Sequence, residues 1–457
     1  MSTEKKYIPL IFEQSKLRVF SRDDRSGSLN LGARIDLRDD VDEETFLRAM
    51  RIGVERLPYM SYRLHETEDG TFVQYRSDEA PEGMDRAVDM SGYTDKRVGK
   101  LLSDWTSEPF PDRLMDTRLY RMKLIRLSGD RLVFFICTHH YIADIYAIIY
   151  ALTYIDRVYS ALADGTALPP AAPDPEETVY KVNARFSSAR YEKNVEWCRR
   201  SITPEPVFTS VNGRNSPEFV KGKNYGKGLG LLQHRSAVIS CGMPDTLQER
   251  LYACARERNI SPQVFFLAAI DCFLGGVSGS DDVTVGLQHN SRLTLTEKST
   301  GLSRGKGIMF RARLDGNESF ESMLRRFDLM QKEYYRYGDI SWEDLFAREY
   351  PIGQDMLYYS TQISYVPFVD YSSLRTCKCA SAIDSGLSIM PLYIIIMPED
   401  ASGRLGFTYK YARGYVKAGN VRRLHAFMLK FLEAGLNAPE KTVAQLREEC
   451  GGLKVHP

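Results

Sequence analysis

Two adjacent histidines, followed four residues later by an aspartate, are the group in this chain best suited to proton transfer. His139 and His140 end a strongly apolar stretch, and Asp144 precedes a second one. Only 7 histidines occur among the 457 residues, so an adjacent pair inside an apolar segment indicates a structural or a chemical role. A neutral imidazole, with a pKa of about 6.5, accepts a proton near neutral pH. One of the two is therefore a candidate general base.

The residues on either side of the pair predict the secondary-structure elements that position it. Residues 118–127 and 132–138 are predicted strands, joined by a short turn that contains Gly129. Neighbouring strand residues point to opposite faces of a sheet. His139 and His140 therefore cannot both face one cavity: one is predicted to be structural and the other free for chemistry.

The apolar stretch after the histidines predicts a helix. Residues 142–159 are apolar almost all round, which is typical of a buried helix. If the helix begins at once, His140 and Asp144 occupy positions i and i+4 on one side of it.

Two other interpretations of the motif exist. The histidines could be buried core residues whose hydrogen bonds are satisfied and which have no catalytic role. They could also belong to a metal site, but His140 and Asp144 supply too few ligands, and His289 is the only distant candidate to add. We therefore predict no metal ion.

The composition excludes some classes of protein. The chain has 61 basic and 60 acidic residues, a net charge of +1, so nothing predicts nucleic-acid binding. Residues 1–6 are polar, which is unlike a secretory signal, and the apolar run at 390–397 is too short to span a membrane. The 8 cysteines follow no disulfide framework, so we expect reduced thiols and a cytoplasmic protein.

Proline spacing predicts the domain organisation. Four prolines cluster within residues 164–177, a composition typical of a linker. We expect an N-terminal lobe at 1–180 that carries the histidines, a crossover helix and loop at 181–235, and a C-terminal lobe at 236–457. The crossover holds a polar, glycine-containing stretch. Its basic residues are predicted to be solvated, although they could meet coenzyme A phosphates: Lys221, Lys223, Lys227 and Arg235.

The pattern HHxxxD at 139–144 resembles the signature of the superfamily of condensation domains and chloramphenicol-acetyltransferase-like acyltransferases. Residues 8–14, 29–64, 261–292 and 405–436 are similar to other segments of that superfamily. The resemblance implies an α/β fold with two chloramphenicol-acetyltransferase-like lobes. Each lobe would be a mixed sheet with flanking helices, and an active-site channel would run between them.

The resemblance also implies a reaction. The chain would move an acyl group from a pantetheine thioester to a small alcohol or amine. The donor would be acyl-coenzyme A or an acyl or peptidyl carrier protein in trans, and no cofactor would stay bound. His140 would be the general base, while His139 would face inward as a structural residue.

The same resemblance assigns the supporting residues. Arg292 would pair with Asp144 across the lobes, unless it is an ordinary surface arginine. Ser360, Thr361 or Ser364 could donate a hydrogen bond to the oxyanion or line the channel.

Two departures from the family pattern bear on the function. Ile145 stands where the family usually has glycine, and Met309 where condensation domains tend to have asparagine. These differences favour a divergent, stand-alone acyltransferase. They also leave open a non-catalytic member that binds an acyl thioester, a carrier protein or a lipid.

Overall fold

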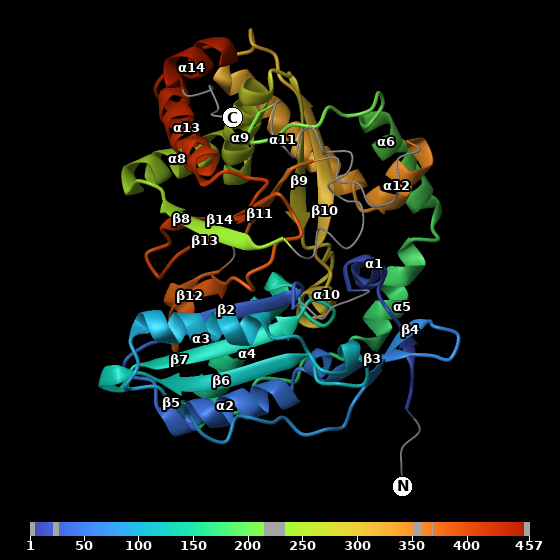
Figure 1. Ribbon diagram of the computed structural model, residues 1–457, viewed down its shortest axis with the longest axis vertical. Helices are drawn as coiled ribbons and strands as arrows, with labels where there is room; N and C mark the ends of the chain where they lie inside the picture. Colours follow the sequence, from blue (N-terminus) through green and yellow to red (C-terminus); the bar gives the residue numbers. More distant parts are fainter. Residues whose placement is uncertain (1–4, 22–26, 214–233, 351–358, 368, 452–457) are drawn as a thin grey trace.

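The computed structural model describes residues 5–21, 27–213, 234–350, 359–367 and 369–451. Within these ranges the chain forms two lobes, each built on a large β-sheet with helices packed against it (Figure 1). The N-terminal lobe fills the lower half of the view, and the C-terminal lobe fills the upper half. The predicted class, two α/β lobes with flanking helices, is confirmed.

The central strand of the N-terminal sheet is β7 (Leu132–His139), and every one of its residues is buried. Its antiparallel neighbours are β2 (Asn30–Leu37) and β6 (Tyr120–Arg126). A strand buried on both faces has a continuous apolar sequence rather than an alternating one, which explains the run before the two histidines. The sheet order is β12-β2-β7-β6-β5, with β5 at Val88–Asp89 and β12 at Cys377–Ile383.

Two helices of this lobe cross closely. The helices α2 (Glu43–Glu55) and α4 (Ile145–Asp164) pack against each other. A Cβ atom at Gly53 would lie 2.6 Å from the side chain of Ile155, so only glycine permits this approach. The other elements of the lobe are α1 (Phe12–Ser21), α3 (Asp95–Ser107), and a small sheet of β1 (Ile8–Pro9), β4 (Phe72–Arg76) and β3 (Tyr62–Glu66).

The C-terminal lobe contains a six-stranded mixed sheet in the order β10-β9-β11-β13-β14-β8. Helix α9 (Pro262–Ser278) is buried along nearly its whole length and packs against β9, α11 and α13. The strands are β8 (Ser236–Gly242), β9 (Asp282–His289), β10 (Lys306–Arg313), β11 (Thr361–Tyr365), β13 (Leu392–Pro398) and β14 (Leu405–Ala412). The other helices are α8 (Asp245–Arg258), α10 (Leu295–Ser299), α11 (Phe320–Tyr337), α12 (Trp342–Glu349), α13 (Ala418–Asn437) and α14 (Val443–Cys450).

One strand crosses from the second lobe into the first. After β11 the chain enters the N-terminal lobe, where β12 pairs antiparallel with β2, and it then returns to β13 (Figure 1). Residues 377–383, which the sequence analysis counted within 236–457, therefore extend the N-terminal sheet. This pairing occupies backbone groups of β2 that an open edge would leave exposed. Two helices, α5 (Glu176–Arg185) and α6 (Ala189–Ser201), carry the chain from the first lobe to the second.

Among the described residues, no single helix is long and apolar enough to cross a membrane. Helices α8 and α9 meet the criteria of length and composition only as a pair, which is bent by 112°.

A carboxyl group lies in the apolar core of the C-terminal lobe. Asp271 on α9 is fully buried, and among the described residues neither of its carboxyl oxygens has a hydrogen-bond partner. Burial raises its pKa well above the ordinary 3.8, although Arg326 and Arg447 act in the opposite direction. The folded protein therefore holds this group in its neutral form.

We predict that Asp271→Leu stabilises the protein, by about 1–3 kcal/mol near neutral pH, because it removes an unsatisfied buried polar group. The unfolded chain ionises this carboxyl above its ordinary pKa of 3.8, so unfolding releases a proton and wild-type stability falls as the pH rises. Denaturant unfolding at pH 5 and pH 8 measures both effects. The control Asp271→Asn cannot ionise and should lose the same pH dependence. A Leu variant that is less stable at both pH values would contradict the prediction.

Candidate active site

The two histidines stand where β7 ends, and their environments differ. His139 is the last residue of the strand and is completely buried. Its Nδ1 accepts a hydrogen bond from the backbone N–H of Tyr141 at 3.2 Å, and its ring stacks on that of Tyr141. His140 lies in the turn after the strand and is only half-buried. Of the two histidines, His140 is therefore the one that keeps some exposed surface.

Asp144 caps the helix that follows the turn. Helix α4 begins at Ile145, and Oδ1 of Asp144 accepts a hydrogen bond from the N–H of Ala147 at 2.9 Å. The helix predicted at 142–159 begins only at Ile145, so the condition for placing His140 and Asp144 at i and i+4 on one side of it is not met. The chain turns first, because an aspartate is a preferred N-cap and its side chain satisfies an N–H at the helix start.

Arg292 lies beside Asp144, although 148 residues separate them in the sequence. Its guanidinium donates two hydrogen bonds to the carboxylate, Nη1 to Oδ2 at 2.9 Å and Nη2 to Oδ1 at 3.0 Å. The arginine side chain is 0% exposed and the aspartate side chain 5%. Burial opposes ionisation of Asp144, yet the guanidinium and the surrounding N–H donors hold its pKa below the ordinary value. The result is a buried, bidentate ion pair between the two lobes.

The segment 301–305 of the C-terminal lobe covers Asp144 and completes its hydrogen bonding. The backbone N–H groups of Arg304 and Gly305 donate to Oδ2 at 2.9 and 2.8 Å. Nη2 of Arg292 donates to the carbonyl oxygen of Leu302 at 2.7 Å, so the ion pair holds this segment from both sides. The segment begins at Gly301, where φ is +68° and a Cβ would lie 2.2 Å from the ring of Tyr59. Glycine is therefore required at that position.

Ser303 in this segment contacts His140 across the lobe boundary. Its Oγ lies 2.9 Å from Nδ1 of His140, and Ser303 is 1% exposed. The sequence analysis missed this residue. A serine in an irregular segment has no periodicity or spacing that would single it out.

The neighbours of His140 bear on which ring nitrogen is basic. Nδ1 lies 2.9 Å from Oγ of Ser303, and the backbone oxygen of His140 itself acts to raise the pKa of the ring. A carbonyl oxygen can only accept, so it favours the tautomer with the proton on Nδ1 and the lone pair on Nε2. Burial lowers the pKa of His140 from its ordinary 6.5, although Asp144 acts in the opposite direction. At neutral pH the ring is therefore neutral, and in this tautomer Nε2 can take up a proton.

The three hydroxyl residues suggested for the oxyanion lie beside or within β11, and all are buried. The hydroxyl of Ser360 donates to the carbonyl oxygen of Thr209 at 2.6 Å and lies 3.3 Å from that of Thr361. Burial raises the pKa of Tyr393 on β13; the Ser364 hydroxyl acts to lower that pKa and the charge of Asp144 to raise it. Of the three residues, Ser364 is therefore the one next to a tyrosine whose pKa responds to the Asp144 carboxylate.

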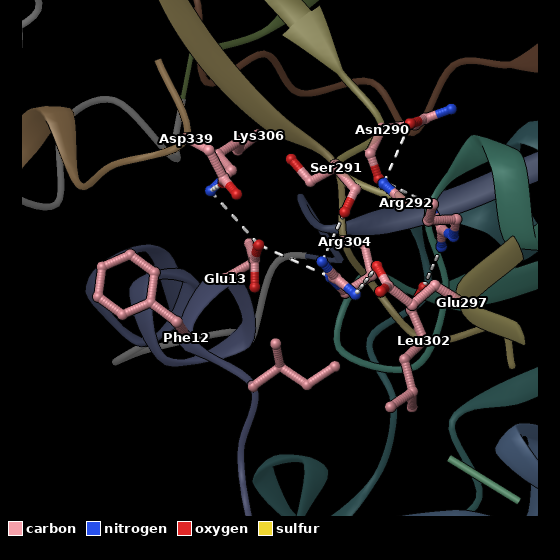
Figure 2. Close-up of polar contacts among 12 residues, drawn as sticks. Phe12, Glu13, Asn290, Ser291, Arg292, Glu297, Leu302, Arg304, Lys306 and Asp339 are labelled. Atoms are coloured by element: carbon pink, nitrogen blue, oxygen red, sulfur yellow. Dashed lines mark hydrogen bonds and ion pairs between the residues drawn. The ribbon is translucent and has the colours of Figure 1, made fainter. Parts of the chain in front are cut away.

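A second group of charges joins the lobes next to this site. Glu13 on α1 is 4% exposed and faces Arg304 and Lys306, with Oε1 at 3.7 Å from Nε and 3.5 Å from Nζ (Figure 2). Lys306 also pairs with Asp339, and Arg304 pairs with Glu297 at 3.3 Å. Arg185 also pairs with Glu297, so the cluster holds three cations and three carboxylates.

Ile145 occupies an ordinary helical position. It is the first residue of α4, and it is not among the described residues with positive φ. The backbone there does not require glycine, so the turn between the histidines and the helix forms without one.

Two further expectations concern other residues. Among the described residues, no three His, Cys, Asp or Glu side chains are grouped so that they could hold a metal ion. Lys221, Lys223 and Lys227 lie outside the described residues. Arg235, the fourth basic residue suggested for coenzyme A, is exposed at the start of the C-terminal lobe.

Comparison with known proteins identifies the family. The family model for the condensation domain matches residues 4–448, so the chain belongs to the condensation-domain family. Domains of this family join thioester-bound acyl or peptidyl groups to an acceptor in amide or ester bonds.

Several curated relatives are large synthetases. Surfactin synthase subunit 1 of Bacillus subtilis (strain 168) is 23% identical over 89% of this chain and 11% of its own length. Cyclosporin synthetase simA of Tolypocladium inflatum is 22% identical over 96% of this chain and 3% of its own length. The chain thus spans only a small part, 11% and 3%, of these two curated relatives.

Solved condensation domains share the whole fold. The first condensation domain of the CDA synthetase has a TM-score of 0.83 at 20% identity, over 96% of this chain and 98% of that one. A mutant of the starter condensation domain of rhizomide synthetase RzmA, in complex with C8-CoA, has a TM-score of 0.80 at 14% identity, over 96% of this chain and 97% of that one.

We predict that Arg292→Ala lowers the free energy of unfolding by about 3–5 kcal/mol, because it leaves the Asp144 carboxylate buried without its partner. The folded pKa of Asp144 is depressed, so the contribution of the pair is present above the ordinary 3.8 and is lost as the pH falls through the folded value. The loss should therefore shrink in acid, as measured by denaturant unfolding.

The matched control is Arg199→Ala, which removes an exposed arginine paired with Glu196 on the same helix. It should leave the unfolding midpoint nearly unchanged. Equal losses in the two variants would show that the buried pair contributes no more than a surface one.

Proposed function

We propose that this chain transfers an acyl group from a pantetheine thioester to an alcohol or amine, with His140 as general base. The observation that carries the proposal is the ring of His140, whose Nδ1 lies 2.9 Å from the hydroxyl of Ser303 and whose Nε2 has no hydrogen-bond partner among the described residues. The ring stands at the boundary of the two lobes, since its partner Ser303 belongs to the opposite lobe. Both substrates would approach it through a channel along that boundary.

In this mechanism the acceptor loses its proton as it attacks. Nε2 of His140 takes the proton of the hydroxyl or amino group while that group forms a bond to the thioester carbonyl carbon. The tetrahedral intermediate collapses with cleavage of the carbon–sulfur bond, and the leaving thiolate takes the proton back from the imidazolium. No covalent enzyme intermediate is needed, because holding both reactants in line supplies much of the acceleration.

Two other groups support the reaction in this proposal. Asp144 fixes the shape of the site through its pairing with Arg292 and does not shuttle protons. The Ser364–Tyr393 hydroxyl pair could donate a hydrogen bond to the oxyanion, the role for which the sequence had offered Ser364. Ser360 is less suited, since its hydroxyl donates to Thr209.

The donor would be acyl-coenzyme A or an acyl or peptidyl carrier protein supplied in trans. Membership of the condensation-domain family supports a pantetheine thioester, and the similar rhizomide domain in complex with C8-CoA is consistent with a coenzyme A donor. The alternative, a non-catalytic member that binds an acyl thioester, a carrier or a lipid, had Ile145 as its best support. The backbone at Ile145 does not require glycine, so the shape of the turn there does not favour that alternative.

We expect His140→Ala to lower turnover by about 10²–10⁴-fold, the usual contribution of a general base, without unfolding the protein. The assay measures free thiol released from a panel of acyl-coenzyme A donors in the presence of mixed alcohols and amines. The control is His65→Ala, which removes a histidine that pairs with Asp116 away from the site. Release near the wild-type rate in the His140 variant would refute the proposed base. Thioester binding without acceptor-dependent release by the wild type would favour the non-catalytic alternative.

The pH dependence of kcat/KM should report the same histidine. Burial lowers the pKa of His140 below its ordinary 6.5, so the base is neutral at and above neutral pH. Activity should therefore be level above pH 7 and fall only as the pH drops below about 6.5. An acid limb centred above pH 7 would mean that another group is being titrated.

A further inference from the structure

Ser303 is the only described side chain hydrogen-bonded to the ring of His140, and it comes from the other lobe. The two residues are 163 apart in the sequence, and their contact is 2.9 Å long. Ser303 is 1% exposed, so its hydroxyl is shielded from water and its position is set by the protein.

The chemistry of Nδ1 defines what the serine does. In the tautomer with the proton on Nδ1, which the backbone oxygen of His140 favours, the Ser303 oxygen accepts from Nδ1. The backbone oxygen belongs to the same residue, so it can fix the tautomer but cannot fix the ring relative to the second lobe. Ser303 is the group that provides this second constraint.

The position of Ser303 is in turn fixed by the ion pair. The residue before it, Leu302, accepts a hydrogen bond from Arg292, and the next residue, Arg304, donates its N–H to Asp144. The side chain of Arg304 is anchored as well, since Nη2 donates to the carbonyl oxygen of Ser291 at 2.6 Å (Figure 2). A hydroxyl between two residues held in this way has little freedom to move.

We propose that Ser303 is a positioning residue that holds the His140 ring from the opposite lobe and so makes the base depend on contact between the lobes. This inference rests on the proposed function. The serine touches neither substrate; it acts by orienting the ring and by stabilising the imidazolium that forms when Nε2 takes up a proton. The same histidine with the lobes apart would keep its tautomer but lose its orientation.

The first test compares Ser303→Ala with Ser303→Thr, which keeps the hydroxyl, and with the control Ser278→Ala. Ser278 is also 1% exposed, but its hydroxyl bonds the backbone of Ser210. We expect kcat to fall about 10–100-fold in Ser303→Ala with KM unchanged, the range typical of groups that orient a functional histidine. Ser303→Thr should recover most of kcat, and Ser278→Ala should keep it. A thermal unfolding curve confirms that each variant is folded.

The second test does not need turnover. Nuclear magnetic resonance of ¹⁵N-labelled histidine reports the pKa and the tautomer of His140, whose signal is assigned by its loss in His140→Ala. Loss of an acceptor that favours the imidazolium should lower the pKa of His140 in Ser303→Ala, while Nδ1 stays protonated. The other titratable groups that act on this ring, Asp144 and His139, are unchanged in the variant.

The outcomes separate the two proposals. An unchanged pKa of His140 in Ser303→Ala, or a kcat equal to that of Ser278→Ala, would overturn the role of Ser303. A shifted pKa in a protein that shows no His140-dependent thiol release would leave Ser303 as the partner of His140 and would instead overturn the proposed acyl transfer.

Discussion

The buried ion pair between Asp144 and Arg292 is the interaction on which the rest of the site depends. Taking two charges out of water is costly, and the cost is recovered only where geometry is good and the remaining polar atoms are hydrogen-bonded. Here the carboxylate accepts from the helix start, from the guanidinium and from two backbone N–H groups. The pair can be satisfied only when the lobes meet in one arrangement, so it specifies that arrangement.

The geometry of the candidate site follows from this constraint. Asp144 ends the turn that contains His140, and Arg292 donates a hydrogen bond to the backbone of the segment that contains Ser303. Both sides of the His140–Ser303 contact are therefore tied to the same pair of charges. The second cluster, around Glu13 and Lys306, adds ion pairs at the same boundary but is not bonded to the histidine.

The sequence predicted the parts of the structure that leave a periodic or positional signal. The two strands predicted before the histidines, at 118–127 and 132–138, form β6 and β7. The strand β12 was missed as part of the first lobe because partner choice between strands is a tertiary property. Within the site, the His139–His140 motif was visible in the sequence. The Asp144 cap and the Ser303 contact were not, because each depends on a turn or a cross-lobe approach that no local pattern encodes.

The excursion of β12 has a consequence for dissecting the molecule. The chain between β11 and β13 leaves the C-terminal sheet, pairs with β2 as the edge strand of the first sheet and returns, so neither half of the sequence contains a complete sheet for the first lobe. A fragment ending before residue 377 would expose the backbone of β2 as an open template for other chains, which is a known route to aggregation. The complementary C-terminal fragment would contain β12 without β2, the strand with which it pairs. Although it has two lobes, the molecule is a single unit for expression, truncation and module exchange.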